Sequence, residues 1–361
     1  MVTREESSEE QVEMHEGIPP LPPVQRSSRT RLTFILGIVA AFSLGIVFSS
    51  LFSSAPSEIK VVTAVPVHSE SVDLPKAVAS SPSSCINSWK ASKARYDARI
   101  DRFRQFRPSS EPREFPLDYI EPLWDCEAKD RVGTSPFGDG PKFMCNVDFT
   151  LKDPDCLVYS IGSNGDGSFE EAVLAISRQC EVHTFDCTLD MNDPRMQRFV
   201  ADAPSKGIHF HDSCLAKPGS QIGNSKTVTL RDAMKYTANQ RPISHFKIDC
   251  EGCEFSSFYD DLGEFDASDP PFDQLMIEIH TPGMGSIQNL FNLFDRLHNL
   301  GLLLFSKERN AWGCGGVHCA EFSFISERAA FRGHIHNQCP EHSGSWKQLC
   351  GQLGIRGCSK S

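Results

Sequence analysis

Short apolar runs alternate with segments of helical periodicity through the C-terminal part of the chain. Residues 157–161 form an apolar run that predicts a buried strand, and a glycine-rich turn follows at 162–167. Apolar positions then recur at helical spacing over 168–177. A second strand is expected at 181–185 and ends on Asp186. This order of strand, glycine turn, helix, strand and acid predicts a nucleotide-binding βαβ unit.

The glycine spacing refines this prediction. The turn reads Gly162-x-x-Gly165-x-Gly167, whereas the dinucleotide fingerprint is GxGxxG. The departure favours S-adenosylmethionine, which has no pyrophosphate to seat on the helix start, over a nicotinamide cofactor. A glycine turn of this kind also occurs as ordinary structure. The candidate cofactor-binding residues are the turn residues and the terminal acid, which can hold ribose hydroxyls: Gly162, Ser163, Asn164, Gly165 and Asp186.

Further strands alternate with helices after this unit. Strand-like runs occur at 208–210, 245–248, 274–279, 302–305 and 321–325. Helical segments, for example 229–238 and 286–300, lie between most of them. Such alternation predicts an α/β fold of Rossmann-like type, with a mostly parallel sheet covered on both faces. A loop rather than a helix joins the last two runs, which suits a closing antiparallel hairpin.

Ionisable residues gather where two of these strands end. Asp249 and Glu251 follow one strand, and Glu278 and His280 lie at the end of the next. Ligands of open α/β sheets bind outside the carboxyl ends of the strands, so these groups should converge near the glycine turn. Asp249 and His280 are the candidate catalytic residues. Glu278, inside an apolar strand, could instead make a structural hydrogen bond.

The N-terminal region carries an apolar, uncharged run at 32–52, about the ~20 residues that a helix needs to span a bilayer. Arg26, Arg29 and Arg31 precede it, so the positive-inside rule places the N-terminus in the cytosol. A cleaved signal peptide is the alternative. The run is, however, longer than a usual signal-peptide core and follows a long polar tail.

These features divide the chain into four parts. The expected parts are a disordered cytoplasmic tail (1–31), a transmembrane signal-anchor helix (32–52), a stem with a helical segment near 86–106 (53–114), and a lumenal domain (115–361). The helix near 86–106 could pack on the domain or pair between chains. We therefore expect a single-pass type II membrane protein of the Golgi or endoplasmic reticulum.

Cysteine usage fits this topology. All 14 cysteines lie at Cys85 or beyond, on the side predicted to be oxidising, so several disulfides are expected. We expect one between Cys126 and Cys145, which flank a loop rich in glycine and proline. Cys250-x-x-Cys253 is more consistent with burial or a structural disulfide than with a redox motif.

Metal and nucleic-acid binding are not expected. Cys314, His318 and Cys319 could form a zinc site, but their spacing matches no strong ligand pattern and a disulfide loop explains it better. We therefore predict no metal. The formal net charge of −11 argues against a nucleic-acid partner, which requires a basic face.

The order of these motifs resembles the methyltransferase-like 24 family (the methyltransferase domain 22 group), which is related to FkbM-type methyltransferases. The resemblance covers roughly Cys126 to Ile325. Its pieces are Arg131-Val132-Gly133, Gly138 to Cys145, Tyr159 to Gly165, Ser168-Phe169-Glu170, Phe185-Asp186, Thr229-Leu230, Lys247 to Glu254 and Gln274 to His280.

Two positions depart from the family pattern. The family's DGGK reads Asp139-Gly140-Pro141-Lys142. The acid often found in the first strand of methyltransferases is absent, with Tyr159 and Ser160 in its place. The second departure leaves the contact to the methionine amino group unassigned.

The resemblance implies an S-adenosylmethionine-dependent methyltransferase. The acceptor would be a small molecule or glycan, with a sugar or another hydroxyl compatible with a secretory location. An alcohol acceptor needs a base, and His280 or Asp249 is the natural candidate. The missing first-strand acid supports an alternative, a catalytically silent methyltransferase fold that acts as a membrane-anchored binding module.

Overall fold

The computed structural model describes residues 82–105, 107, 115–135, 137–222, 225–236, 241–266 and 268–358. The expected tail (1–31), the anchor (32–52) and the first part of the stem lie outside these residues. Among the helices of the described part, none is long and apolar enough to cross a membrane.

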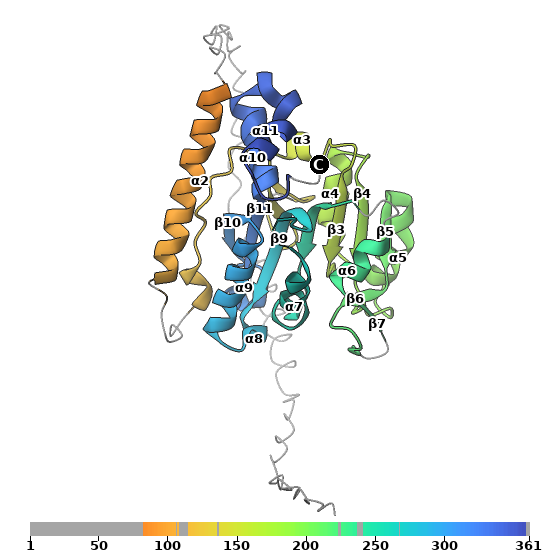
Figure 1. Ribbon diagram of the computed structural model, residues 1–361. Helices are drawn as coiled ribbons and strands as arrows, with labels where there is room; N and C mark the ends of the chain where they lie inside the picture. The colour runs from red at the N-terminus through yellow and green to blue at the C-terminus, as the bar shows by residue number, and fades with distance from the viewer. Residues whose placement is uncertain are drawn as a thin grey trace, which may run out of the picture. The chain divides into compact units, whose positions relative to one another are not determined.

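A seven-stranded sheet forms the centre of the domain (Figure 1). Its order is β10-β11-β9-β8-β3-β4-β5, and the five strands from β9 to β5 are parallel. β11 runs antiparallel to both of its neighbours. The predicted Rossmann-like α/β sheet with a closing antiparallel hairpin is therefore confirmed. The strands are β3 (Leu157–Ile161), β4 (Glu181–Phe185), β5 (Ile208–His211), β8 (Ile243–Ile248), β9 (Phe272–His280), β10 (Leu302–Arg309) and β11 (Cys319–Ser326).

Alternate residues of the central strands enter two different cores, because successive side chains of a strand point to opposite faces. Tyr159 and Ile277 pack on one face with α9 (Ile287–Asn299), whereas Val158 and Met276 pack on the other. The second face is covered by α4 (Ser168–Ile176) and neighbouring segments. Burial on both faces explains why the strands read as continuous apolar runs.

Smaller elements complete the domain. A hairpin of β1 (Lys129–Val132) and β2 (Lys142–Cys145) and a parallel pair of β6 (Ser213–Leu215) and β7 (Lys226–Val228) lie beside the main sheet. The remaining α-helices are α3 (Val147–Thr150), α5 (Pro194–Lys206), α6 (Leu230–Ala233), α7 (Tyr259–Asp261), α8 (Thr281–Met284), α10 (Glu327–Gln338) and α11 (Trp346–Gln352).

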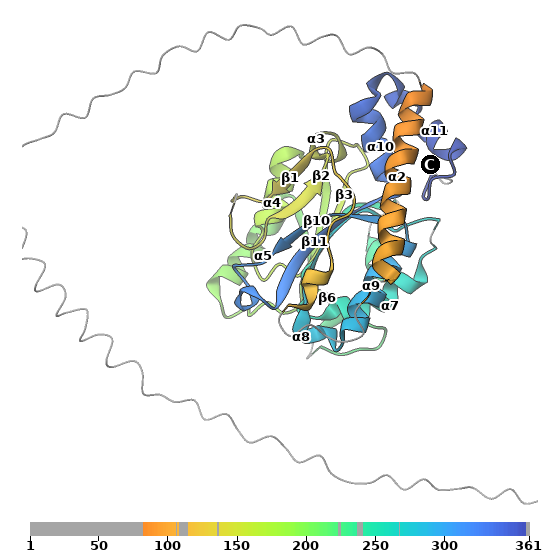
Figure 2. The ribbon, with the colours of Figure 1, turned by 90° about the vertical axis from the view of Figure 1, so that its left-hand side faces the viewer.

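The helix predicted near 86–106 is α2 (Pro82–Gln105), and it packs on the domain beside α10 and α11 (Figure 2). Trp89 is buried, and its ring centroid lies 5.2 Å from that of Phe331. The disulfide between Cys85 and Cys339 ties the start of this helix to the end of α10. Packing on the domain, one of the two alternatives for this segment, is what the structure shows.

All 14 cysteines are paired in the structure. The expected bond between Cys126 and Cys145 is present, and it links the β1–β2 hairpin to the segment before it. The pairs are Cys85–Cys339, Cys126–Cys145, Cys156–Cys180, Cys187–Cys214, Cys250–Cys253, Cys314–Cys319 and Cys350–Cys358.

Candidate active site

The glycine turn after β3 lies against the ends of both neighbouring strands. Gly162 has a φ of 75°, a conformation that favours glycine, and a Cβ there would collide with the carbonyl oxygen of Asp249. Its amide donates to the carbonyl oxygen of Phe185 (2.9 Å), and its own carbonyl accepts from Nζ of Lys247 (2.5 Å). Gly162 therefore joins β4, β3 and β8 where the strand order reverses, the usual ligand position in such sheets.

Asp186 anchors the glycine turn. One carboxylate oxygen accepts from the amides of Ser163 (2.9 Å) and Asn164 (2.8 Å). The other accepts from the amide (2.9 Å) and hydroxyl (2.8 Å) of Thr188. The sequence predicted a carboxylate available to ribose hydroxyls. In the structure Asp186 lines the cavity described next, but both oxygens already bind the chain, so its first role is to hold the turn in place.

A cavity of about 590 Å³ opens at the carboxyl edge of the sheet, within the usual size range of ligand sites. Its lining follows the strand order β4, β3, β8 and β9: Phe185 and Asp186, Gly162, Asp249, then Glu278 and His280. The β4 side, here called the apolar end, includes Phe185, Leu215 and Ile222. The β9 side, here called the acidic end, includes Asp139, Asp249, Glu251, Glu278, His280, Gly313 and Cys314.

His280 and Glu254 form a buried dyad at the acidic end. Nδ1 of His280 lies 2.8 Å from Oε1 of Glu254, which opens the π-helix η3 (Glu254–Phe258) and is fully buried. Because an ionised carboxylate only accepts hydrogen bonds, Nδ1 carries the proton and Nε2 is the basic nitrogen of the neutral ring. Nε2 lies 3.5 Å from Glu251, 3.8 Å from Asp249 and 3.9 Å from Glu278.

The surroundings of His280 favour its charged form. Burial disfavours protonation, but the hydrogen bond that Nδ1 donates to Glu254 and the negative charges of Glu254, Glu251 and Asp249 outweigh it and raise the pKa of His280. His280 is thus a stronger base than an ordinary histidine. Its side chain also lines the cavity.

Lys142 projects from β2 into a cluster of carboxylates behind His280. Its ammonium contacts Glu321 and lies 3.5 Å from Asp249 and 3.8 Å from Glu278. Burial disfavours the charge of Lys142, yet the three carboxylates outweigh it and raise the pKa of this lysine. The Lys142 ammonium therefore persists in the buried cluster.

Asp249 and Glu278 take opposite protonation states in this cluster. Burial would raise the pKa of Asp249, but the charges of Lys142, Lys247 and His280 outweigh it and lower the pKa. For Glu278, burial and the neighbouring charges of Glu321 and Asp249 raise the pKa to about 10. At neutral pH Asp249 is therefore ionised and Glu278 is protonated. The two carboxyl groups both lie near the end of a strand in the sequence pattern, yet they differ in charge.

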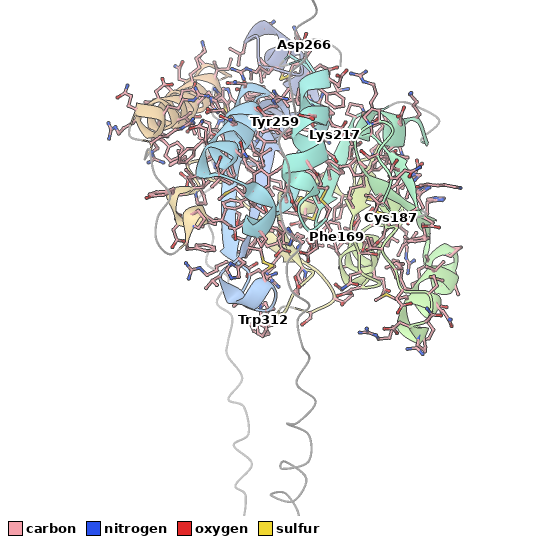
Figure 3. All side chains as sticks on the ribbon, turned by 90° about the horizontal axis from the view of Figure 1, so that it is seen from below. Phe169, Cys187, Lys217, Tyr259, Asp266 and Trp312 are labelled. Atoms are coloured by element: carbon pink, nitrogen blue, oxygen red, sulfur yellow. A yellow bond between two sulfur atoms is a disulfide. The ribbon has the colours of Figure 1, made fainter. Side chains whose placement is uncertain are left out.

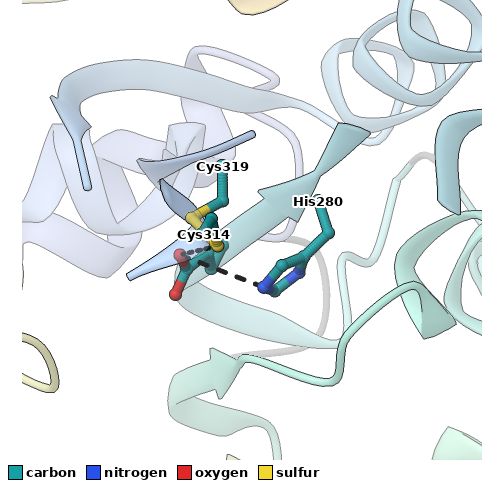
Figure 4. Close-up of side chains that lie close together, drawn as sticks. His280, Cys314 and Cys319 are labelled. Atoms are coloured by element: carbon teal, nitrogen blue, oxygen red, sulfur yellow. Dashed lines mark hydrogen bonds and ion pairs between the residues drawn. A yellow bond between two sulfur atoms is a disulfide. The ribbon is translucent and has the colours of Figure 1, made fainter. Parts of the chain in front are cut away.

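Three sets of side chains bring metal-ligand atoms within 4.8 Å of one another in the part of the chain that the structure describes. One set shares its space with the Lys142 ammonium, which already pairs with three of its four members: Asp139, Asp249, Glu278 and Glu321. Another uses two cysteines that are bonded to each other: Glu278, His280, Cys314 and Cys319 (Figure 4). The third is Asp249, Glu251 and His280, in which the Glu251 side chain is 82% exposed.

The two cysteine motifs are disulfides. Cys314 and Cys319 are bonded, so the predicted alternative to a zinc site is what the structure shows. Cys250 and Cys253 are also bonded, and their short loop spans from Asp249 to Glu254. This loop thus fixes the spacing of two residues at the acidic end.

The structure adds three residues that the sequence pattern did not select. The sequence could have pointed to two of them: Lys142 ends the DGGK-like motif, and Glu254 ends the run 247–254 that resembles the family. No sequence motif pointed to Asn310. In the structure its side-chain amide donates to Glu278 (2.9 Å) and to Asp139 (3.1 Å). Each acts through partners that are distant in sequence, which explains why periodicity and spacing did not identify them.

The absence of a first-strand acid is visible in the fold. Tyr159 is fully buried and donates its hydroxyl hydrogen to the carbonyl oxygen of Ala233 (2.9 Å). Ser160 is also buried, and neither residue lines the cavity. The nearest acid on the following helix, Glu170, is buried as well, and burial raises its pKa. The methionine end of a cofactor would therefore need other partners.

Comparison with known proteins identifies the domain. A family model described as a methyltransferase domain matches residues 83–326. The chain belongs to this methyltransferase family. The match begins within α2 and ends at the last residue of β11, so this methyltransferase domain includes the helix that packs beside the sheet.

Solved structures also match, each at low identity. An O-methyltransferase from Bacillus cereus in complex with SAH is 10% identical, with a TM-score of 0.32, over 50% of this chain and 80% of that one. A human methyltransferase 10 domain containing protein is 13% identical, with a TM-score of 0.32, over 50% and 78%. The Methanococcus jannaschii fibrillarin pre-rRNA processing protein is 14% identical, with a TM-score of 0.31, over 48% and 67%. No curated protein sequence matches the chain.

Proposed function

We propose that this protein transfers a methyl group from S-adenosylmethionine to a hydroxyl of its acceptor. The observation that carries the proposal is the Glu254–His280 dyad, because its His280 lines the same cavity as the glycine turn of a methyltransferase-family domain. A methyl transfer to nitrogen or sulfur would need no strong base, whereas an alcohol must lose its proton. A buried histidine with an orienting carboxylate supplies that base.

The cavity fits this methyl donor. Gly162 leaves no room for a side chain, because a Cβ would collide with the carbonyl oxygen of Asp249, so the turn packs directly against the end of β8 beside the cavity. The apolar end, with Phe185, Leu215 and Ile222, suits a nucleoside base, and the acidic end suits hydroxyl groups. S-adenosylmethionine supplies a methyl group on a positively charged sulfur, and the acidic lining favours a cation. The residues that would hold it are Gly162, Ser163 and Asn164, which line the cavity. Gly165 continues the same turn, and Asp186 would act by fixing that turn through the amides of Ser163 and Asn164.

The chain's own residues handle the proton. Nε2 of His280 accepts the hydrogen of the acceptor hydroxyl as the new oxygen–carbon bond forms and the carbon–sulfur bond breaks. Glu254 holds the ring by its Nδ1 and stabilises the imidazolium that results. Asp249, ionised beside Lys142, lies 3.8 Å from Nε2 and adds negative charge toward the same ring. Positioning of the two reactants supplies much of the remaining acceleration.

The proposal includes a cellular setting. Arg26, Arg29 and Arg31 before the apolar run 32–52 support a type II anchor with the domain in the Golgi or endoplasmic reticulum, and the seven disulfides suit that compartment. Assignment to the methyltransferase-like 24 group rests on the motif order alone. Protease added to intact microsomes should remove the tail and spare the domain, and digestion of the domain without detergent would contradict this topology.

The decisive experiment measures donor binding and transfer separately. Full-length protein in detergent should bind S-adenosylhomocysteine by calorimetry and transfer radiolabelled methyl groups to a pool of secretory-pathway glycans. Failure to bind S-adenosylhomocysteine would refute the proposed donor. Binding without transfer, once a broad acceptor pool has been tried, would favour the catalytically silent binding module.

A further inference from the structure

The loop between β10 and β11 presents an exposed tryptophan beside the acidic end of the cavity. Trp312 is 64% exposed, and Figure 3 shows it at the rim of the face seen from below. The next two residues, Gly313 and Cys314, line the cavity. Trp312 is therefore the residue directly before the part of this loop that lines the cavity.

This loop is held rigidly. The side-chain oxygen of Asn310 accepts from the amides of Trp312 (2.9 Å) and Gly313 (2.8 Å). The disulfide between Cys314 and Cys319 closes the loop where β11 begins. A ring on a fixed loop loses little conformational entropy when a ligand binds to it, which favours binding.

A second exposed aromatic residue lies on the neighbouring loop. Phe137 is 73% exposed and lies in the loop before β2. The two loops are joined, because Asn310 donates to Asp139 (3.1 Å). Val317, on the Trp312 loop, is also exposed. Large apolar side chains that remain exposed together usually mark a binding site.

The charge of the cavity selects among possible partners. Six carboxyl side chains line it, of which Glu278 is protonated at neutral pH: Asp139, Asp166, Asp186, Asp249, Glu251 and Glu278. In the described part of the chain its lining contains a single lysine, Lys247, whose ammonium donates to the carbonyl oxygen of Gly162. Anionic acceptors and anionic lipid surfaces are therefore repelled, whereas carboxylates can accept hydrogen bonds from several neutral hydroxyls.

We propose that Trp312 is the acceptor platform of this site and that the acceptor is a neutral carbohydrate. An open, flat indole suits the apolar face of a sugar ring, while a phenol or similar planar acceptor would fit better in an enclosed apolar slot. The sugar's hydroxyls meet the acidic end, and one of them reaches His280. This inference rests on the proposed methyl transfer and specifies its acceptor.

The test uses full-length protein in detergent with two probe sets: neutral oligosaccharides, and the same oligosaccharides capped with sialic acid. With S-adenosylhomocysteine present, calorimetry should show binding of the neutral set and weaker binding of the sialylated set. Trp312→Ala should weaken neutral binding, and raise the KM of methyl transfer, by about tenfold or more. Trp312→Phe, which keeps a flat ring, should restore most of both.

Ile176→Ala is the matched control, since Ile176 is an exposed apolar residue that does not line the cavity. Equal affinities for Trp312→Ala and Ile176→Ala, or no binding of neutral oligosaccharides by a protein that binds S-adenosylhomocysteine, would overturn the inference and leave the proposed function standing. Absence of S-adenosylhomocysteine binding would count against the proposed function itself.

Discussion

Oε1 of Glu254 lies 2.8 Å from Nδ1 of His280, and both residues are buried at the carboxyl edge of the sheet. One comes from the start of a π-helix and the other from the end of β9. The pair fixes the ring so that Nε2 is the nitrogen available to an acceptor. In this arrangement His280 can act as a base, and Glu254 orients its ring.

We expect His280→Ala to lower methyl transfer by about 10²-fold or more, the usual scale for loss of a general base. S-adenosylhomocysteine affinity should stay close to that of the wild type, because the glycine turn is untouched. Single-turnover kinetics and calorimetry on the same preparations measure the two quantities. Wild-type transfer rates in the variant would exclude His280 as the base.

Glu254→Gln should have a smaller effect on the rate, about 10- to 100-fold, because the amide oxygen can still accept from Nδ1 but brings no charge to stabilise the imidazolium. The pKa of His280 should also fall toward its ordinary value, since Glu254 helps to raise it. Nuclear magnetic resonance titration of the ring would measure that change. An unchanged His280 titration in a folded variant would show that Glu254 does not orient the base.

The pH dependence of the wild type follows from the raised pKa of His280, which faces Glu254, Glu251, Asp249 and Glu278. Because the base must be neutral to accept a proton, kcat/KM should rise with pH, with its midpoint above the ordinary histidine value of about 6.5. The contribution of His280 to the stability of the fold decreases as the pH rises. The bound proton stabilises the fold fully below about pH 6.5, and this contribution is lost as pH rises through the folded-state pKa.

A rate profile whose midpoint lies at or below the ordinary histidine value would contradict this environment of His280. The control is the profile of Glu254→Gln, whose midpoint should lie lower than that of the wild type for the same physical reason. Both profiles can be measured with a single acceptor once transfer has been detected.

Glu278→Gln should be tolerated, because glutamine resembles the protonated acid and can still accept from Asn310. The pKa of Glu278 is raised to about 10, so the folded state keeps a proton that the unfolded state loses near the ordinary value of 4.5. The wild type therefore loses stability as pH rises from about 5 toward 10, and Glu278→Gln should lack this part of the slope. The free energy of unfolding of Glu278→Gln minus that of the wild type should therefore be larger at pH 9 than at pH 5.

Lys142→Met is the contrasting variant, since it removes the ammonium that neutralises Asp249 and Glu321. Breaking such a buried pair should cost about 3–5 kcal/mol in the free energy of unfolding. Denaturant unfolding at several pH values measures both variants. A stable Lys142→Met protein, or a parallel pH slope for Glu278→Gln and wild type, would refute this account of the cluster.

Gly162→Ala should disrupt the site even though it adds only a methyl group. The φ of 75° costs a non-glycine residue about 1–2 kcal/mol, and the new Cβ would collide with the carbonyl oxygen of Asp249. We expect a lower melting temperature and loss of S-adenosylhomocysteine binding. Gly351→Ala, at a helical position with open space around it, is the control and should match the wild type. Normal donor binding by Gly162→Ala would show that the donor site does not require the close packing of this turn against Asp249.

The sequence by itself determined the fold class and the edge at which the site lies. Mainly apolar runs such as 157–161 form strands that are buried on both faces, and the intervening periodic segments form the covering helices. Asp249 and His280 then had to meet the glycine turn, since the carboxyl ends of parallel strands share one edge. The disulfide between Cys126 and Cys145 also followed from the flanked loop.

Tertiary structure alone decided the partners within the site. Lys142 meets Asp249 only because β2 lies against β9 and β11, and Asn310 meets Glu278 only because β10 ends at the same edge as β9. Asp186 has the position that the sequence predicted, yet its hydrogen-bond capacity is already used by Ser163, Asn164 and Thr188, and local spacing does not reveal this. Periodicity specifies which face or edge a residue occupies. The distances that shift a pKa or align a base depend on strand order and register, which are set by contacts between residues far apart in the chain.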